Sequence, residues 1–179
     1  GLVDIVTPNY MHAPPARAAI EAGKPVACEK PIAGTLDDAR AMVEAAKAKG
    51  VKTFVWFNYR RVPAVALAHQ MVTSGELGEI RHVRAVYLQD WADESVPLAW
   101  RFEKKWAGSG AHGDLNAHII DMTRFVTGQE ITRIAGAIAE TFIKERTLAG
   151  GTAGGGLADG GKAVGGKGPV TVDDTVLFL

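Results

Sequence analysis

The sequence predicts an α/β fold, in which a partial doubly wound parallel sheet (residues 1–60) is followed by an α+β domain with a mostly antiparallel open sheet (residues 61–179). Three observations predict this order. Short apolar runs alternate with helical patterns in the first part, which is typical of parallel strands joined by helices. A long alternating segment at 79–91 then indicates a strand with one covered face. A glycine-rich run that enters an amphipathic helix at 108–127 completes the pattern.

Five elements are expected before residue 60, and each is bounded by residues typical of turns. The expected strands cover 2–6, 24–28 and 51–57, and the expected helices cover 16–22 and 35–49. Gly23 and Gly50 follow the two helices, where glycine readily adopts the left-handed conformation that ends a helix. Thr35 and Asp38 have the spacing of a capping box, with Asp in place of the usual Glu or Gln.

The second part is expected to contain two helices and three strands. The helices cover 63–74 and the run that ends near 127, and the strands cover 79–91, 131–143 and 170–179. Residues 149–168 are rich in glycine and are expected to form a flexible loop between two strands. Within them, 156–163 nearly matches a phosphate-binding loop, but Ala163 stands where Ser or Thr would hold the metal. We therefore do not expect phosphate to bind there.

Composition excludes several classes of function. Twenty Lys and Arg residues balance twenty Asp and Glu residues, so we expect no nucleic-acid partner and no membrane partner. No apolar run is long enough to span a membrane, and the first residues do not resemble a signal peptide. Cys28 is the only cysteine, which excludes an internal disulfide and fits a cytoplasmic location. Both ends of the chain lie within strand-like runs, so we expect a fragment of a longer protein.

Polar side chains follow each of the three expected parallel strands, at 7–9, 29–30 and 58–61. Because ligands bind parallel sheets at the carboxyl ends of the strands, these side chains are expected near a ligand. In the later helix, Asp114 and His118 are four residues apart and share one face. A carboxylate one turn from an imidazole can orient the ring of a general base, although such pairs are also common on solvated helix faces.

Three blocks of residues have an order and spacing known from one family. The blocks are Val3 to Asn9 with His12, then Glu29-Lys30-Pro31, and then Gly110-x-x-Gly-Asp114-x-x-x-His118. Together they resemble the glucose–fructose oxidoreductase / inositol dehydrogenase / MocA family over essentially the whole chain. The resemblance implies a Rossmann domain, and a second domain whose sheet mediates homo-oligomers. It also implies a dehydrogenase that uses NAD or NADP and acts on a sugar, polyol or related hydroxy or keto compound.

The resemblance assigns roles to single residues. Cofactor-binding positions would be Thr7, Pro8, Asn9, His12, Glu29, Lys30, Trp100 and Arg101. Substrate-binding positions would be Lys30, Tyr59, Arg60, Asp90, Asp114 and His118. His118 would be the acid or base, Lys30 would polarise the reacting oxygen, and Asp114 would bind a neighbouring hydroxyl or orient the ring. We therefore expect Lys30 and His118 to share one pocket. The bond between Lys30 and Pro31 is often cis in relatives.

Three other functions stay open. His112, Asp114, His118 and Asp121 are candidates for a zinc or manganese site of a hydrolase or isomerase. A relative that uses NAD only transiently would catalyse a lyase or glycosidase reaction, and a non-catalytic sugar-binding protein would keep the same fold. In this family the glycine turn that binds pyrophosphate would precede Gly1, so the isolated 179 residues are expected to bind NAD poorly and to be inactive.

Overall fold

The first sheet contains three parallel strands in the order β1–β2–β3, in a computed structural model that describes residues 1–150 and 162–179. The strands are β1 (Val3–Ile5), β2 (Val26–Cys28) and β3 (Thr53–Val55). Val26 pairs with Val3 on one side and with Thr53 on the other, so β2 is central, and all three of its residues are buried. The predicted parallel sheet is confirmed.

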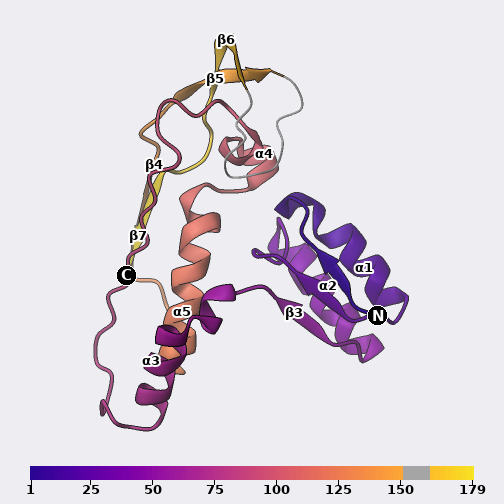
Figure 1. The fold of residues 1–179 in the computed structure, drawn as a ribbon, viewed down its shortest axis with the longest axis vertical. Coiled ribbons are helices and arrows are strands. Elements are labelled where there is room, and N and C mark those ends of the chain that lie inside the picture. The colour runs from indigo at the N-terminus through magenta and orange to yellow at the C-terminus, as the bar shows by residue number, and fades with distance from the viewer. Residues whose placement is uncertain (151–161) are drawn as a thin grey trace.

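Two helices, α1 (Ala13–Glu21) and α2 (Leu36–Lys49), pack against this sheet (Figure 1). Their apolar side chains meet those of the strands in one core, which includes Ile5, Ala16, Ile20, Val26, Cys28 and Met42. The predicted start of α2 is confirmed, because the backbone N of Asp38 donates to Thr35 Oγ1 over 3.1 Å. Its predicted end is confirmed as well, with Gly50 at a φ of 62°.

After β3 the chain enters its second part, where α3 (Pro63–Thr73) and α5 (Ala117–Thr127) lie side by side (Figure 1). The ring of His69 stacks on Phe125 with centroids 4.3 Å apart, which joins the two helices. Short helical segments connect the longer elements: η1 (Asn9–Met11), η2 (Asn58–Arg61), η3 (Trp100–Phe102), α4 (Lys104–Ala107) and the π-helical turn η4 (His112–Asn116), which leads directly into α5.

Two antiparallel pairs of strands complete the described chain. β4 (Ala137–Glu140) pairs with β7 (Thr175–Phe178), and β5 (Glu145–Gly150) pairs with β6 (Lys162–Pro169). A second core lies near β5 and β6 and contains Phe102, Ala107, Val170 and Val172. The predicted α+β character of the second part, with antiparallel strands, is confirmed.

The strand predicted at 79–91 is wrong. This segment has no regular structure, and no strand of the described residues pairs with it. A strand needs a neighbour for its backbone hydrogen bonds, and an alternating pattern alone does not supply one. Val86 and Leu88 accordingly remain exposed. The strands predicted at 131–143 and 170–179 are shorter than expected and are limited to β4 and β7.

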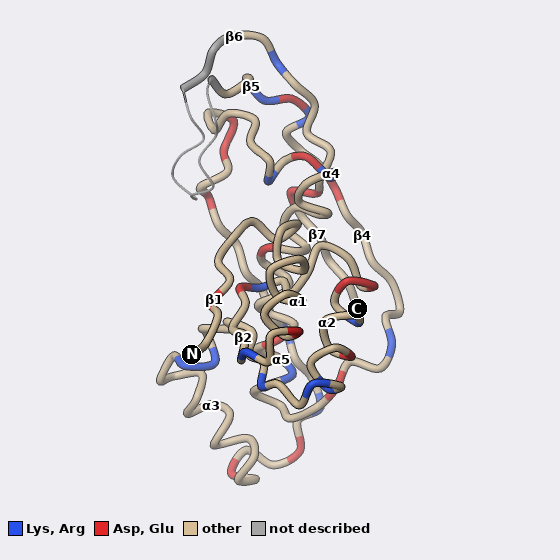
Figure 2. The backbone as a smooth tube through the Cα atoms, turned by 90° about the vertical axis from the view of Figure 1, so that its right-hand side faces the viewer, with Lys and Arg blue, Asp and Glu red and all other residues tan. Residues whose placement is uncertain are grey.

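Residues 151–161 lie outside the described residues, and most of the near match to a phosphate-binding loop at 156–163 lies there too. Part of the predicted loop at 149–168 is strand, because β6 begins at Lys162. Among the described helices, none has the length and apolar character needed to cross a membrane. Figure 2 shows basic residues interspersed with acidic ones along the backbone, in line with their equal numbers.

Candidate active site

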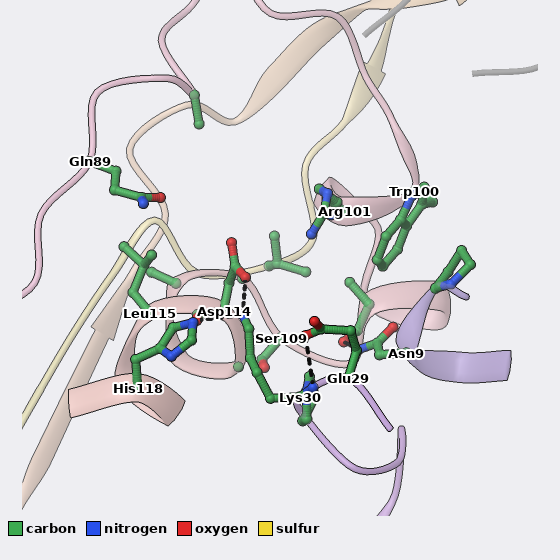
Figure 3. Close-up of a pocket in the computed structure, with 18 of the residues that line it drawn as sticks. Asn9, Glu29, Lys30, Gln89, Trp100, Arg101, Ser109, Asp114, Leu115 and His118 are labelled. Atoms are coloured by element: carbon green, nitrogen blue, oxygen red, sulfur yellow. Dashed lines mark hydrogen bonds and ion pairs between the residues drawn. The ribbon is translucent and has the colours of Figure 1, made fainter. Parts of the chain in front are cut away.

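A cavity of about 560 Å³ lies where the carboxyl ends of β1, β2 and β3 meet the start of α5 (Figure 3). Residues 6–9, 29–31 and 58–59 line one side, and each group lies shortly after one of the three parallel strands. Ser109, Asp114 and His118 line the other side, from the glycine-rich loop and the helix that follows it. The cavity therefore lies at the edge of the sheet where ligands are expected.

Lys30 and Asp114 meet in this cavity although 84 positions separate them in the sequence. Lys30 Nζ lies 2.6 Å from Asp114 Oδ1 and donates a second bond to the Asp114 carbonyl oxygen over 2.9 Å. The peptide bond between Lys30 and Pro31 is cis, and the Lys30 backbone N donates to Glu29 Oε2. An ammonium has three donors, so Lys30 keeps one for a ligand.

His118 lies one turn after Asp114 and lines the same cavity, so it shares a pocket with Lys30 as predicted. Aromatic rings surround the imidazole, with the Tyr59 centroid at 4.6 Å and the Phe57 centroid at 6.2 Å. Its Nδ1 is buried and has no hydrogen-bond partner in the part of the chain that the structure describes. The Nε2 atom is therefore the nitrogen available to a ligand.

The surroundings of His118 favour its neutral form. Burial lowers the pKa of His118, and the nearby charge of Lys30 lowers it further, against the opposite effect of Asp114 and Asp121. Desolvation and a like charge both disfavour the imidazolium. The ring can thus accept a proton near neutral pH.

The start of the helix is fixed by a residue near the other end of the chain. The backbone N atoms of Gly110 and His112 donate to the Asp173 carboxylate over 2.9 and 2.7 Å. A Cβ on Gly110 would lie 1.9 Å from the Asp173 carbonyl oxygen, so the close approach requires glycine. Asp173 and Asp174 also line the cavity. No local pattern identifies them, because their contacts depend on the tertiary fold.

Most of the predicted cofactor-binding residues line the cavity, namely Thr7, Pro8, Asn9, Glu29, Lys30, Trp100 and Arg101. Asn9 Nδ2 donates to the Ala107 carbonyl oxygen over 2.9 Å, which ties η1 to α4. The Arg101 guanidinium lies 4.6 Å from the Trp100 ring centroid. Figure 3 shows Arg101 pointing into the cavity on the side away from Lys30.

His12 also borders the cavity, but it is only 1% exposed. Its Nδ1 lies 2.9 Å from the Pro31 carbonyl oxygen, and its Nε2 lies 2.8 Å from the Thr7 carbonyl oxygen. The ring therefore joins the loop after β1 to the loop after β2. Both of its nitrogens are occupied, so His12 supports the two loops that line this part of the cavity from behind.

The predicted substrate-binding residues of η2 have different positions. Tyr59 lines the cavity, whereas Arg60 turns to Asp121 and forms two hydrogen bonds, Nε to Oδ2 at 2.8 Å and Nη2 to Oδ1 at 2.5 Å. Asp121 is 3% exposed, so this ion pair anchors η2 to α5. Asp90 is not among the residues that line the cavity.

Alternate residues of the neighbouring segment line the cavity in place of Asp90. Gln89 Nε2 donates to Tyr87 Oη, and Trp91 Nε1 donates to Gln89 Oε1, both over 2.8 Å. The Tyr87 hydroxyl lies 2.5 Å from that of Tyr59, and this hydrogen bond raises the pKa of Tyr87. The alternating pattern at 79–91 could have predicted that Tyr87, Gln89 and Trp91 face the same side, because every second residue of an extended chain does so.

Two family models match the chain. One, described as "Oxidoreductase family, NAD-binding Rossmann fold", matches residues 1–57, and the other, described as "GFO/IDH/MocA C-terminal domain", matches residues 65–179. The chain belongs to the GFO/IDH/MocA family. The family and the Rossmann character predicted from the sequence are confirmed.

Several relatives within the GFO/IDH/MocA family act on sugars by name. Levoglucosan dehydrogenase of Pseudarthrobacter phenanthrenivorans is 49% identical over 177 residues, which cover 98% of this chain and 45% of that protein. The 1,5-anhydro-D-fructose reductase of Ensifer adhaerens is 37% identical over 131 residues, which cover 72% of this chain and 38% of that protein. A solved structure of levoglucosan dehydrogenase in complex with NADH and levoglucosan has a TM-score of 0.85 at 46% identity, with 99% of this chain and 43% of that chain covered. The chain therefore spans less than half the length of these relatives.

The fold of this chain does not bring together the four residues that were candidates for a metal site. Among the described residues, no group of three or more His, Cys, Asp or Glu side chains could hold a metal ion. The His112 ring packs edge-on against Phe178, with centroids 6.4 Å apart, and does not line the cavity. Asp114 is already paired with Lys30. The predicted cluster of His112, Asp114, His118 and Asp121 is divided among different partners.

Proposed function

We propose that the complete protein carrying this chain is an NAD(P)-dependent oxidoreductase. It would transfer hydride between nicotinamide and a sugar, polyol or related hydroxy or keto compound. The observation that carries this proposal is the meeting of Lys30, Asp114 and His118 at one cavity, with 2.6 Å between Lys30 Nζ and Asp114 Oδ1. The similarity to levoglucosan dehydrogenase supports the substrate class.

Oxidation of a secondary alcohol removes a proton from the hydroxyl oxygen and a hydride from the carbon. Nicotinamide, when bound, accepts the hydride at C4. His118 Nε2 takes the hydroxyl proton, because its neutral form is favoured in this site. Lys30 donates its remaining hydrogen bond to the same oxygen and stabilises the negative charge that develops there. In the reverse reaction the proton returns from His118 to the oxygen as the carbonyl is reduced.

Asp114 positions both the ammonium and the substrate in this proposal. Its Oδ1 and its carbonyl oxygen hold Lys30, which fixes the direction of the third ammonium donor. No hydrogen bond engages Oδ2 in the described residues, so this oxygen is available to a neighbouring substrate hydroxyl. A compound with adjacent hydroxyl groups fits this arrangement, in which Asp114 Oδ2 accepts from one hydroxyl and Lys30 Nζ donates to the oxygen of the other.

The cofactor, NAD or NADP, would lie beside the ends of β1 and β2. Thr7, Asn9 and Glu29 supply polar side chains there and Pro8 an apolar one, and a carboxylate such as that of Glu29 is a suitable acceptor for ribose hydroxyls. Trp100 and Arg101 would close the opposite side. The volume of about 560 Å³ is in the range of small-molecule sites.

The test is hydride transfer by the complete protein. Purified protein is incubated with NAD⁺ or NADP⁺ and with levoglucosan, inositols or simple aldoses, and the absorbance of the reduced nicotinamide is followed. We expect reduction of the cofactor, and a loss of about 10²–10⁴ in kcat for His118→Ala. His112→Ala is the matched control, since His112 is nearby and does not line the cavity.

Three outcomes would contradict the proposal. Full turnover by His118→Ala would remove the base from the mechanism. Conversion of a sugar without net reduced nicotinamide would indicate transient use of NAD in a lyase or glycosidase reaction. Cofactor binding with no turnover of any sugar would indicate a non-catalytic binding protein.

The homo-oligomer is also a proposal, with β4 and β7 as the contact. Ile138 and Leu177 pair across these strands and are 62% and 63% exposed, and Phe142, shortly after β4, is 70% exposed. Contiguous exposed apolar side chains mark interaction surfaces. The double variant Ile138→Asp and Leu177→Asp should sediment as a monomer, and a monomeric wild type would contradict the proposal.

We also propose a cytoplasmic location. The thiol of Cys28 is free and buried, and a free thiol is typical of a reducing compartment.

A further inference from the structure

Arg146, on β5, is the largest fully buried side chain among the described residues, with 1% exposure. Its guanidinium donates to three backbone carbonyl oxygens of one loop. Nη1 lies 2.5 Å from the Asp93 oxygen and 2.8 Å from the Val96 oxygen, and Nη2 lies 2.6 Å from the Ala92 oxygen. The planar group also lies 3.9 Å from the centroid of the Phe102 ring.

The elements that Arg146 holds form one wall of the cavity. Trp91 and Ala92 line the cavity at the start of the loop, and Phe102 lines it at the end of η3. The rings of Trp91 and Phe102 lie 6.0 Å apart, so the two lining segments pack against each other over the guanidinium. Lys30, Asp114 and His118 belong to other elements and make no hydrogen bond with Arg146.

The stability of the fold does not by itself account for an arginine at this position. No carboxylate forms an ion pair with Arg146 in the described chain, and its Nε is buried without a hydrogen-bond partner. Burial lowers the pKa of Arg146, which reflects the cost of desolvating the charge, against the opposite effect of the Asp174, Asp93 and Glu94 carboxylates. The guanidinium holds its neighbours in fixed positions, because its planar fork donates to three carbonyl oxygens at once while its face stacks on the Phe102 ring.

We propose that Arg146 is a positioning residue for substrate binding: it fixes the loop 91–98, whose Trp91 and Ala92 form a preformed wall of the cavity together with Phe102. It thereby sets the affinity for the sugar and not the rate of hydride transfer. This inference rests on the proposed function. A lysine in its place keeps the charge but has no planar fork, so the wall would keep its fold and lose its fixed position.

The experiment compares Arg146→Lys and Arg146→Gln with the wild type in the complete protein. We expect KM for the sugar to rise about tenfold for the lysine variant, below the hundredfold cost of misplacing a reacting group by about 1 Å, while kcat stays within about twofold. Hydrogen–deuterium exchange should accelerate in residues 91–98 and stay unchanged in α5. Arg124→Lys is the matched control, since Arg124 pairs with Glu130 away from the cavity and should leave KM unchanged.

An unchanged KM in Arg146→Lys overturns the proposal, and so does a fall in kcat without a change in KM. If no sugar is turned over by the wild type, the proposed function has failed, and the exchange pattern alone tests Arg146. Faster exchange confined to residues 91–98 then supports the positioning role, and unchanged exchange overturns it. Should the glutamine variant not fold, the lysine variant still decides.

Discussion

In the oxidation direction of the proposed reaction His118 must start as a neutral imidazole, and its surroundings favour that form. The His118 residue is 9% exposed, and its Nδ1 is buried without a hydrogen-bond partner in the described residues. Burial and the charge of Lys30 place the pKa of His118 below its ordinary value of about 6.5. The neutral fraction therefore persists at a lower pH than for an exposed histidine, and proton acceptance is lost only as the pH falls through this lowered pKa.

Replacement of Asp114 should move the titration of His118 further down. The carboxylate of Asp114 raises the pKa of His118 against the stronger effects of burial and Lys30, so Asp114→Asn removes support for the imidazolium. We expect a lower midpoint in an NMR titration of the His118 ring protons. Asp90→Asn serves as the control, because Asp90 does not line the cavity. A midpoint that rises in Asp114→Asn would contradict this account of the site.

The buried ring of His12 should contribute to the free energy of unfolding through its contacts with two carbonyl oxygens. A neutral ring carries one N–H, so its two contacts are both donated hydrogen bonds only when both nitrogens are protonated. His12→Phe fills the same space and leaves the carbonyl oxygens of Thr7 and Pro31 without this partner. We expect a loss of about 1–3 kcal/mol in urea denaturation, because a neutral ring donates to one of the two carbonyl oxygens and one buried unsatisfied group costs about that much. His112→Phe, at an exposed ring, should be nearly neutral.

At the scale of an element, the start of the η4–α5 helix depends on the absence of a side chain at Gly110. A Cβ there would lie 1.9 Å from a backbone oxygen of Asp173, which no rotamer change can relieve. Gly110→Ala should cost about 1–3 kcal/mol and lower activity, because the helix that carries Asp114 and His118 must shift. Gly136→Ala is the control, since its Cβ would meet nothing within 4 Å. Equal stability of the two variants would rule out this close approach.

Elements held by local interactions were predictable from the sequence, and elements that need a distant neighbour were not. The cap at Thr35 and the glycine at Gly50 determine the ends of α2 within a few residues, and both were predicted correctly. The segment 79–91 has the alternation of a strand, but its backbone finds no strand to pair with in the described residues. The π-helical turn before α5 was missed as well, because it follows from the Asp173 contact and not from periodicity.

At the scale of the whole molecule, part of the site followed from one general rule. Parallel strands end at one edge, so the polar residues after β1, β2 and β3 could be placed together, and the family resemblance added Asp114 and His118 to them. Asp173 and Arg146 could not be placed, because each reaches the cavity or its wall through contacts with distant segments. Arg60 and Asp90, which the resemblance assigned to substrate binding, do not line the cavity.

The pair of Lys30 and Asp114 joins the first part of the chain to the second, and a double-mutant cycle should measure that link. Both side chains are mostly buried, at 13% and 28% exposure, so solvent screens the pair less than it screens a surface pair. Lys30→Met, Asp114→Ala and the double variant should give a coupling of about 1–2 kcal/mol in urea denaturation. The bond from Lys30 Nζ to the Asp114 carbonyl oxygen survives in Asp114→Ala, so the cycle reports the side-chain contact alone. The same cycle on Lys47 and Glu44, an exposed pair within α2, should give a coupling near zero. Equal couplings for the two pairs would mean that Lys30 and Asp114 do not hold the two parts of the chain together.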